Sequence, residues 1–300
     1  MANGKIQRTS SSVLSAQPFS LGRKLVKQLA ELPYYIILGA WSVFTIFTFI
    51  WLIYSSFKNN QELFANVWKL PASLHWQNYN TAWVSAQMGT YFLNSVWVVG
   101  ASIVLTIALS APASYVLARR TFFGNTGIVT LFIMGMAIPH QLLLVPIFIL
   151  LNNMHLINTL SGLILVYTAV SLPFTIFLLI GFYKTLPTEL EESAAIDGAS
   201  EFVTFIKIMF PLTLPGIITA AILNFITLWS EYMLALVLIN DNAKRTLSLG
   251  VYNLKNTMTF TSDWVGMFAG VVILMIPSVI IFVALSEKIT SGMTVGATKG

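Results

Sequence analysis

The stretch from Thr188 to Pro215 reads T-E-L-E-E-S-A-A-I-D-G-A-S-E-F-V-T-F-I-K-I-M-F-P-L-T-L-P. This polar block lies between two long apolar runs. It holds five of the eleven acidic residues, in a chain where only 9% of residues are charged. So many carboxylates between apolar runs must lie in water, because burying an unpaired charge in hydrocarbon is costly. The block therefore predicts a solvent-exposed docking surface.

The composition outside this block is that of a membrane protein. Hydrophobic residues make up 56% of the 300 residues and the mean hydropathy is +0.79, well above the soluble average. A helix needs about 20 apolar residues to cross the hydrocarbon core, and the long runs lack the alternation of barrel strands. We therefore expect an all-α integral membrane protein. Five stretches contain no Asp, Glu, Lys or Arg: 32–57, 70–118, 121–183, 208–230 and 264–286.

These apolar runs predict six transmembrane helices. The third and fourth come from one run, which we divide at Asn152-Asn153-Met154-His155 because four polar or adaptable residues favour a turn. The predicted spans are 34–54, 91–117, 128–151, 159–182, 213–239 and 264–286.

The basic residues predict the orientation of these spans. Eleven of the sixteen Lys and Arg residues fall on the side that holds both termini and residues 187–211. The positive-inside rule places that side in the cytosol. We thus expect cytosolic tails at 1–32 and 291–300 around a transmembrane domain at 33–290, and the net charge of +5 reflects topology, not nucleic-acid binding.

The sequence offers little catalytic chemistry. It has no Walker-type phosphate-binding motif, no cysteine, and three histidines that are far apart, so we expect neither an ATPase site, a metal site nor enzyme activity. Among the charged residues, only Glu231 lies clearly inside a predicted span. A proton-coupled carrier would carry more buried ionisable groups.

The segment 187–211, called the 187–211 loop below, predicts two short helices. Thr188 and Glu191 fit a capping box at the start of the first helix. Asp197-Gly198 is expected to end it, and a second helix is expected to start near Ser200. An amphipathic loop on the membrane surface is the alternative. Its acidic start fits an anionic leaflet poorly, which favours a protein partner.

The loop also resembles a known motif, E-A-A-x-x-x-G followed after about nine residues by I-x-L-P. The chain has E-S-A-A-I-D-G at 192–198 and I-M-F-P at 208–211, with Ser193 and Phe210 as mild departures. It is similar to the permease subunits of bacterial ABC importers, in the carbohydrate-uptake branch that includes subunits similar to the maltose permease G protein. Further matching stretches are Y-V-L-A-R-R at 115–120, I-P at 138–139, L-P-F at 172–174, R-T-L at 245–247 and G-A-T-K-G at 296–300.

The resemblance implies a multi-pass subunit of the bacterial inner membrane that forms half of a sugar path. It implies a second permease subunit in a heterodimer, two cytosolic P-loop ATPases that bind the ATP, an extracytoplasmic solute-binding protein, a sugar substrate and surrounding lipid. It implies no cofactor in this chain and no nucleic acid. The residues implied to couple to the ATPase are Glu191, Glu192, Ser193, Ala194, Ala195, Asp197 and Gly198.

Three residues of the fifth predicted span are candidates for the sugar path. Indole rings stack on sugars and amides bond hydroxyls, so Asn224 and Trp229 fit that role, and Glu231 fits an outer gate. Glu231 could equally lie at the outer headgroups. Two other functions remain open: a single-chain ion-coupled secondary transporter, which predicts buried carboxylates, and a membrane scaffold that recruits a cytosolic enzyme without transport.

Overall fold

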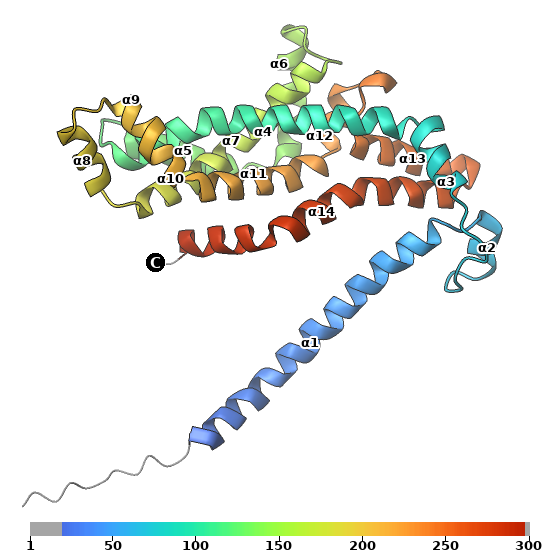
Figure 1. Cartoon of the computed structure of the whole chain (residues 1–300). Coiled ribbons are helices and arrows are strands. Elements are labelled where there is room, and N and C mark those ends of the chain that lie inside the picture. The colour runs from blue at the N-terminus through green and yellow to red at the C-terminus, as the bar shows by residue number, and fades with distance from the viewer. Residues whose placement is uncertain (1–19, 298–300) are drawn as a thin grey trace, which may run out of the picture. The chain divides into compact units, whose positions relative to one another are not determined.

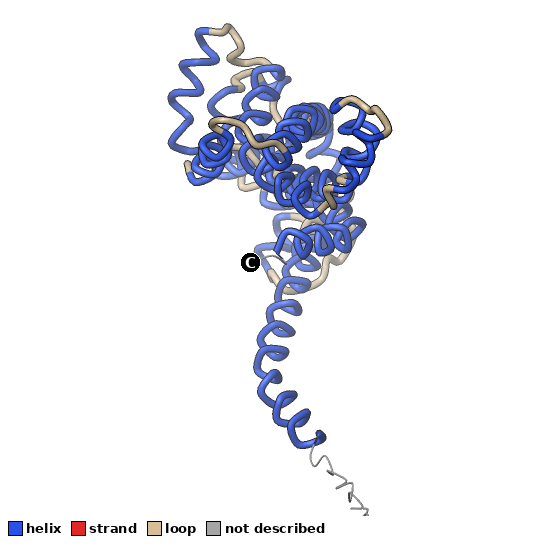
Figure 2. The backbone as a smooth tube through the Cα atoms, turned by 90° about the vertical axis from the view of Figure 1, so that its left-hand side faces the viewer, coloured by secondary structure: helices blue, strands red, loops and turns tan. Residues whose placement is uncertain are grey.

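The structure is a computed structural model that describes residues 20–297, and within this range it contains helices and loops but no strand (Figure 2). It divides into two units, Met1–Trp51 and Leu52–Gly300. The predicted single domain at 33–290 thus has its first helix in a separate unit.

Helix α1 (Ser20–Ser55) makes up the described part of the first unit and ends at the start of the second. Its apolar stretch Glu31–Ser55 is long enough to cross a membrane, and none of the residues in its most apolar 18-residue window is buried. Such a stretch, apolar on all sides, is suited to contact lipid.

The second unit is built around α4 (Met88–Arg119), α7 (Leu160–Thr185), α11 (Leu214–Trp229) and α14 (Trp264–Ala297), which run alongside one another (Figure 1). Helices α4 and α7 pack most extensively, through buried hydroxyl side chains. Ser102 Oγ donates to the Ile164 carbonyl over 3.4 Å, and Ser114 Oγ donates to the Ile176 carbonyl over 3.2 Å. Small residues of this kind let helix backbones approach closely where lipid replaces water outside.

Two predicted spans are broken helices. Asn125–Ala137 (α5) and His140–Asn153 (η2 His140–Leu143 and α6 Leu144–Asn153) bend by 95° at Ile138-Pro139. The prediction of one continuous span over 213–239 is wrong, because α11 ends at Trp229 and a separate helix, α12, covers Met233–Leu238. By length and composition the described residues hold four membrane-crossing helices, or six if each bent pair counts as one.

At the end of the unit remote from the 187–211 loop lie short elements and α13 (Leu247–Thr261), labelled on the right of Figure 1. The short elements are α2 (Asn60–Ala65), α3 (Gln77–Asn80), η1 (Thr81–Ser85) and η4 (Asn242–Lys244). Helix α2 starts with a capping box between Asn59 and Glu62, which we did not predict from the sequence.

The predicted tails are partly helical. Residues 20–32 belong to α1, and α14 continues through 291–297, so neither tail is a separate segment over those residues. The rest of both tails, 1–19 and 298–300, lies outside the described residues.

Candidate functional site

The 187–211 loop forms two helices that meet at a glycine. The first, α8 (Glu189–Ile196), ends in a Schellman motif in which the Gly198 amide donates to the Ala195 carbonyl and the Ala199 amide donates to the Ala194 carbonyl. Gly198 has φ +76°, the left-handed conformation that glycine adopts most readily. The predicted break at Asp197-Gly198 is confirmed.

The second helix starts at Ser200, as predicted, and the Ser200 hydroxyl accepts from the Val203 amide. It runs through α9 (Glu201–Thr204), the π-helical turn η3 (Phe205–Met209) and α10 (Phe210–Leu212). It then meets α11 at a bend of 68°. The loop thus leads directly into the fifth predicted span.

The predicted capping box at Thr188 is wrong. Thr188 has helical φ and ψ of −71° and −27°, and its side chain makes no capping hydrogen bond. The Glu191 side chain, expected to reach back to Thr188, turns toward the end of α4. An ion pair with a largely buried arginine and a hydrogen bond from Tyr115 outweigh an exposed local cap, because hydrogen bonds to a charged group are the stronger ones.

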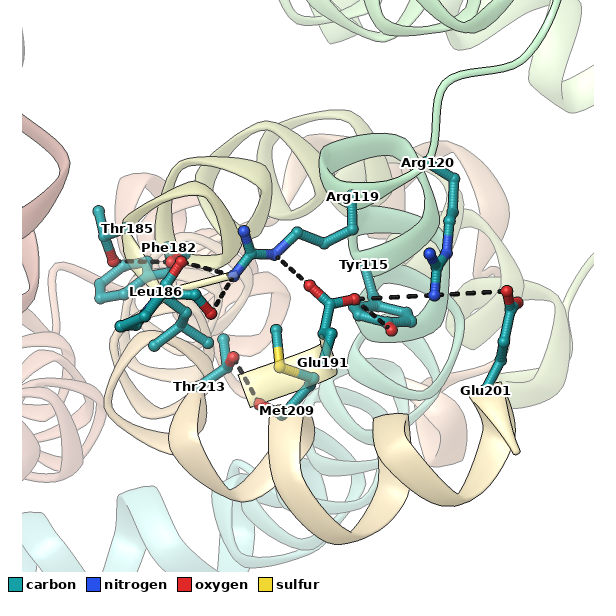
Figure 3. A network of polar contacts seen from close by, with 11 residues as sticks. Tyr115, Arg119, Arg120, Phe182, Thr185, Leu186, Glu191, Glu201, Met209 and Thr213 are labelled. Atoms are coloured by element: carbon teal, nitrogen blue, oxygen red, sulfur yellow. Dashed lines mark hydrogen bonds and ion pairs between the residues drawn. The ribbon is translucent and has the colours of Figure 1, made fainter. Parts of the chain in front are cut away.

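Figure 3 shows the polar network that results, with Glu191 at its centre. Tyr115 donates its hydroxyl to Glu191 Oε1 over 2.7 Å, and Arg119 Nε lies 3.1 Å from Glu191 Oε2. The other end of the Arg119 guanidinium donates to the Leu186 carbonyl over 2.6 Å. The Arg119 and Glu191 side chains are only 8% and 13% exposed. One arginine therefore holds both the start of the loop and its first helix.

Arg120 extends this network to the second helix of the loop. Its terminal nitrogen lies 3.8 Å from Glu191 Oε1 and 3.3 Å from Glu201 Oε1. The Tyr115 ring packs against Phe205 of η3 and Tyr183 of α7, with ring centroids 5.2 Å and 5.6 Å apart. Polar and aromatic contacts together bind both loop helices to the end of α4.

The seven predicted coupling residues separate into two groups. Glu191 and Ala194 face inward, and Ala194 is buried. The other five lie on the exposed surface of the loop, next to the strongly exposed apolar side chains of Ile196 (86%) and Phe202 (73%). The exposed five are Glu192, Ser193, Ala195, Asp197 and Gly198.

A cavity of about 190 Å³ lies among α5, α7, α11 and α12 and contains no residue of the loop. Two of the three predicted path residues, Asn224 and Glu231, line it together with His140, Ser171 and Thr227. Buried Asn224 donates to Thr175 Oγ1 over 2.9 Å. The cavity thus combines an amide, a carboxylate, an imidazole and hydroxyls, which suits a hydroxyl-rich ligand.

Glu231 holds the break between α11 and α12. Its carboxylate accepts from the Tyr167 hydroxyl over 2.6 Å and from the amides of Leu234 (2.7 Å) and Ala235 (3.4 Å). Its backbone carbonyl accepts from Ser248 Oγ. Backbone amides and a carbonyl at the break are therefore hydrogen-bonded although the helix is interrupted.

Trp229, the third predicted path residue, does not line this cavity. It is buried at 2% exposure, its indole N–H donates to the Leu274 carbonyl over 2.9 Å, and its ring stacks on Phe225. No group of three or more His, Asp or Glu residues placed to hold a metal ion occurs in the described part of the chain.

Sequence reasoning gave Tyr115, Arg119 and Arg120 no role of their own. A signal was present: two arginines close a span on the side predicted to hold the acidic 187–211 loop, and opposite charges on one face attract. Their pairing with particular carboxylates depends on the tertiary packing of α4 beside the loop.

Residues 110–295 match the family described as binding-protein-dependent transport system inner membrane component. The chain belongs to this family. Membership of this family fits the helical, membrane-type fold. The matched range includes the residues of the network around Glu191 and the residues that line the cavity.

Three curated relatives are similar in sequence to this chain over most of its length. The diacetylchitobiose uptake system permease protein NgcG of Streptomyces coelicolor is 36% identical, covering 85% of this chain and 85% of its own length. The melibiose/raffinose/stachyose import permease protein MelC of Bacillus subtilis is 32% identical, over 79% and 86%. The sulfoquinovosyl glycerol transport system permease protein SmoH of Agrobacterium fabrum is 34% identical, over 85% and 89%.

A solved structure shares the fold. A chain in the crystal structure of a bacterial ABC transporter involved in the import of the acidic polysaccharide alginate superposes with a TM-score of 0.74, covering 90% of this chain and 98% of that one. Only 18% of residues are identical, so this likeness bears on the fold alone. The helical membrane architecture expected from the sequence is confirmed.

Proposed function

We propose that this protein is a permease subunit of a binding-protein-dependent ABC importer for a sugar or oligosaccharide. The observation that carries the proposal is the 187–211 loop: Ile196 within the E-S-A-A-I-D-G motif and Phe202 just after it are exposed, and the base of the loop is tied to α4. A surface that exposes large apolar side chains beside charged ones is typical of a protein-docking site.

The partner at this surface would be a cytosolic P-loop ATPase. A hollow of about 260 Å³ between the loop helices is lined by the carboxylates of Glu191, Glu192 and Glu201 and by one cation, Arg120. This excess of negative charge favours a basic side chain from the partner. Closure of two ATPases on ATP would then move the loop, while this chain binds no nucleotide or other cofactor.

The assembly would contain a second, different permease subunit, two ATPases and an extracytoplasmic solute-binding protein. We place this chain in the bacterial cell membrane, with the loop and both termini in the cytosol. The charge bias of the sequence supports this orientation.

The substrate class rests on the relatives, whose names specify diacetylchitobiose, melibiose, raffinose, stachyose and sulfoquinovosyl glycerol. All are sugars or sugar derivatives. We propose that Asn224 and Glu231 meet such a substrate at the cavity, where an amide and a carboxylate can bond hydroxyl groups. Trp229 would act behind them, by supporting α11 against α14.

The test is purification of the tagged chain from its own host in mild detergent, followed by mass spectrometry. A second permease and a P-loop ATPase at stoichiometric levels are expected. A chain that purifies alone at every detergent and salt concentration, and transports sugar in vesicles without ATP, would instead support a single-chain ion-coupled carrier.

A variant separates transport from simple recruitment of a partner. Gly198→Pro is expected to abolish transport while the ATPase still copurifies, because proline cannot adopt the positive φ at this turn. Unchanged transport would contradict the coupling role of the loop. Gly124→Pro, at another positive-φ glycine with open space around it, is the control matched for residue type and backbone strain.

A further inference from the structure

The two adjacent glutamates of the loop point to different partners. Glu192 is exposed on α8, whereas Glu191 is directed into the protein and meets Tyr115 and Arg119 at the end of α4. We propose that the Tyr115–Arg119–Glu191 cluster is the joint through which movement of the loop passes into α4. The inference rests on the proposed function and assigns these three as positioning residues for coupling.

The joint is built to resist separation. Arg119 uses different nitrogens for the Glu191 carboxylate and the Leu186 carbonyl, so it grips the loop at its entry and on its first helix (Figure 3). The guanidinium is planar and rigid, which makes such a two-sided grip directional. Little water reaches the pair, and removing one partner would leave a poorly solvated charge behind.

Neither covalent connection of the loop continues a neighbouring helix in a straight line. At its start, Leu186 is extended (φ −73°, ψ 143°) before Pro187 and does not continue the helix of α7. At its end, the chain bends by 68° before α11. A push on the loop can therefore be absorbed at both backbone junctions, whereas the side-chain joint connects it directly to α4.

Helix α4 carries the connection to the other end of the unit. Near its start, Asn94 donates to the carbonyls of Ala243 and Arg245 over 2.8 Å and 2.9 Å. The neighbouring Ser95 hydroxyl accepts from the Leu247 amide over 2.8 Å. One helix of 32 residues, about 48 Å long at 1.5 Å per residue, thus contacts the 187–211 loop at one end and the segment 243–247 at the other.

The first experiment measures sugar transported per ATP hydrolysed, with the complete transporter in proteoliposomes. Glu191→Gln and Tyr115→Phe are expected to lower this ratio about tenfold, a factor that the loss of a charged hydrogen bond supplies. ATP hydrolysis and copurification of the ATPase persist. Glu189→Gln, on the exposed side of the same helix, is the matched control and should keep the ratio within about twofold.

A distance measurement tests the joint directly, and the absence of cysteine from the chain makes labelling simple. Spin labels at Leu93→Cys on α4 and Thr188→Cys at the start of α8 occupy exposed positions. Their separation is expected to stay constant between nucleotide-free and ATP-bound transporter. In Glu191→Ala the distance should become broader and dependent on nucleotide.

The outcomes distinguish the two proposals. If no ATPase copurifies with the unmodified chain, the proposed function fails. If the ATPase binds and transport proceeds, but the label distance changes with nucleotide while Glu191 is intact, the joint is overturned. A coupling ratio in Glu191→Gln equal to that of Glu189→Gln would overturn it as well.

Discussion

The break between α11 and α12 gives the clearest test of how this membrane protein tolerates an interrupted helix. In Tyr167→Phe the buried ring keeps its shape, but the hydroxyl that donates to Glu231 over 2.6 Å is lost. The affected carboxylate oxygen then keeps only the Ala235 amide, at 3.4 Å. A hydrogen bond to a charged group contributes about 1.5–3 kcal/mol, so we expect a loss of about 2 kcal/mol in the free energy of unfolding.

Thermal unfolding of the purified protein in detergent measures this loss. For a chain of this size, about 2 kcal/mol corresponds to a decrease in Tm of about 6 °C. Tryptophan fluorescence suits the assay, because Trp229 is buried only two residues before Glu231. Tyr232→Phe is the control, since that ring is partly exposed and stacks on Tyr252. The reasoning is refuted if both variants melt at the same temperature.

A double-mutant cycle then isolates the pair. Glu231→Gln alone should destabilise the protein, because the amide replaces one accepting oxygen by a donor. Adding Tyr167→Phe to that variant should cost less than it does in the unmodified chain, and the difference gives the interaction free energy of the two side chains. If the losses in unfolding free energy of the two single variants add up to that of the double variant, the two side chains do not interact.

Three further predictions concern packing and charge. Gly216→Ala places a Cβ 2.5 Å from the Phe182 ring, so the free energy of unfolding should fall by about 1–3 kcal/mol in a chemical denaturation assay. Hydrogen bonding from the Ala243 amide, and then Lys244, lowers the pKa of Asp241 in the folded protein. The stabilisation by this carboxylate is therefore complete above its ordinary pKa and is lost as pH falls through the lower folded value. On acidification below about pH 4, the Tm of Asp241→Asn should therefore fall less than the Tm of the unmodified chain. Lys58→Met should speed proteolysis near residue 67, because the buried ammonium donates to carbonyls there.

Each of these predictions has its own contrary result. Gly181→Ala meets no atom within 4 Å of its Cβ, so equal stability losses at 216 and 181 would contradict the packing argument. An unchanged acid dependence in Asp241→Asn would show that the carboxylate has the same pKa in folded and unfolded protein. Equal proteolysis rates for Lys58→Met and the unmodified chain would show that the segment around residue 67 keeps its structure without this lysine.

Apolar runs were sufficient to predict the helical membrane fold, but not where helices break. The mean hydropathy of 213–239 hides the interruption at 230–232, because its stability comes from Tyr167 and Ser248, far away in the sequence. The 95° bend at Ile138-Pro139 likewise lies within a run without any charged residue. Composition reports whether a segment can enter lipid, and tertiary hydrogen bonds decide whether it enters as one helix.

The 187–211 loop was predictable in outline for a different reason. Its two helices follow from local signals at Gly198 and Ser200, which act within a few residues. The direction of Glu191 depends on Tyr115, 76 positions earlier, and no local rule covers that separation. Local capping therefore predicted the shape of the loop correctly and the role of its central carboxylate wrongly.

The two helix breaks that sequence reasoning missed lie beside the same cavity. Met136 and His140 flank the Ile138-Pro139 bend, Glu231 lies in the gap between α11 and α12, and Leu234 follows that gap; all four line the cavity. Within a bilayer, irregular backbone is stable only where protein covers it or where it borders a water-filled space. A cavity bordered by two such breaks and by Asn224 is therefore the place in this chain where a polar solute would meet the least hydrocarbon, which supports the proposed path.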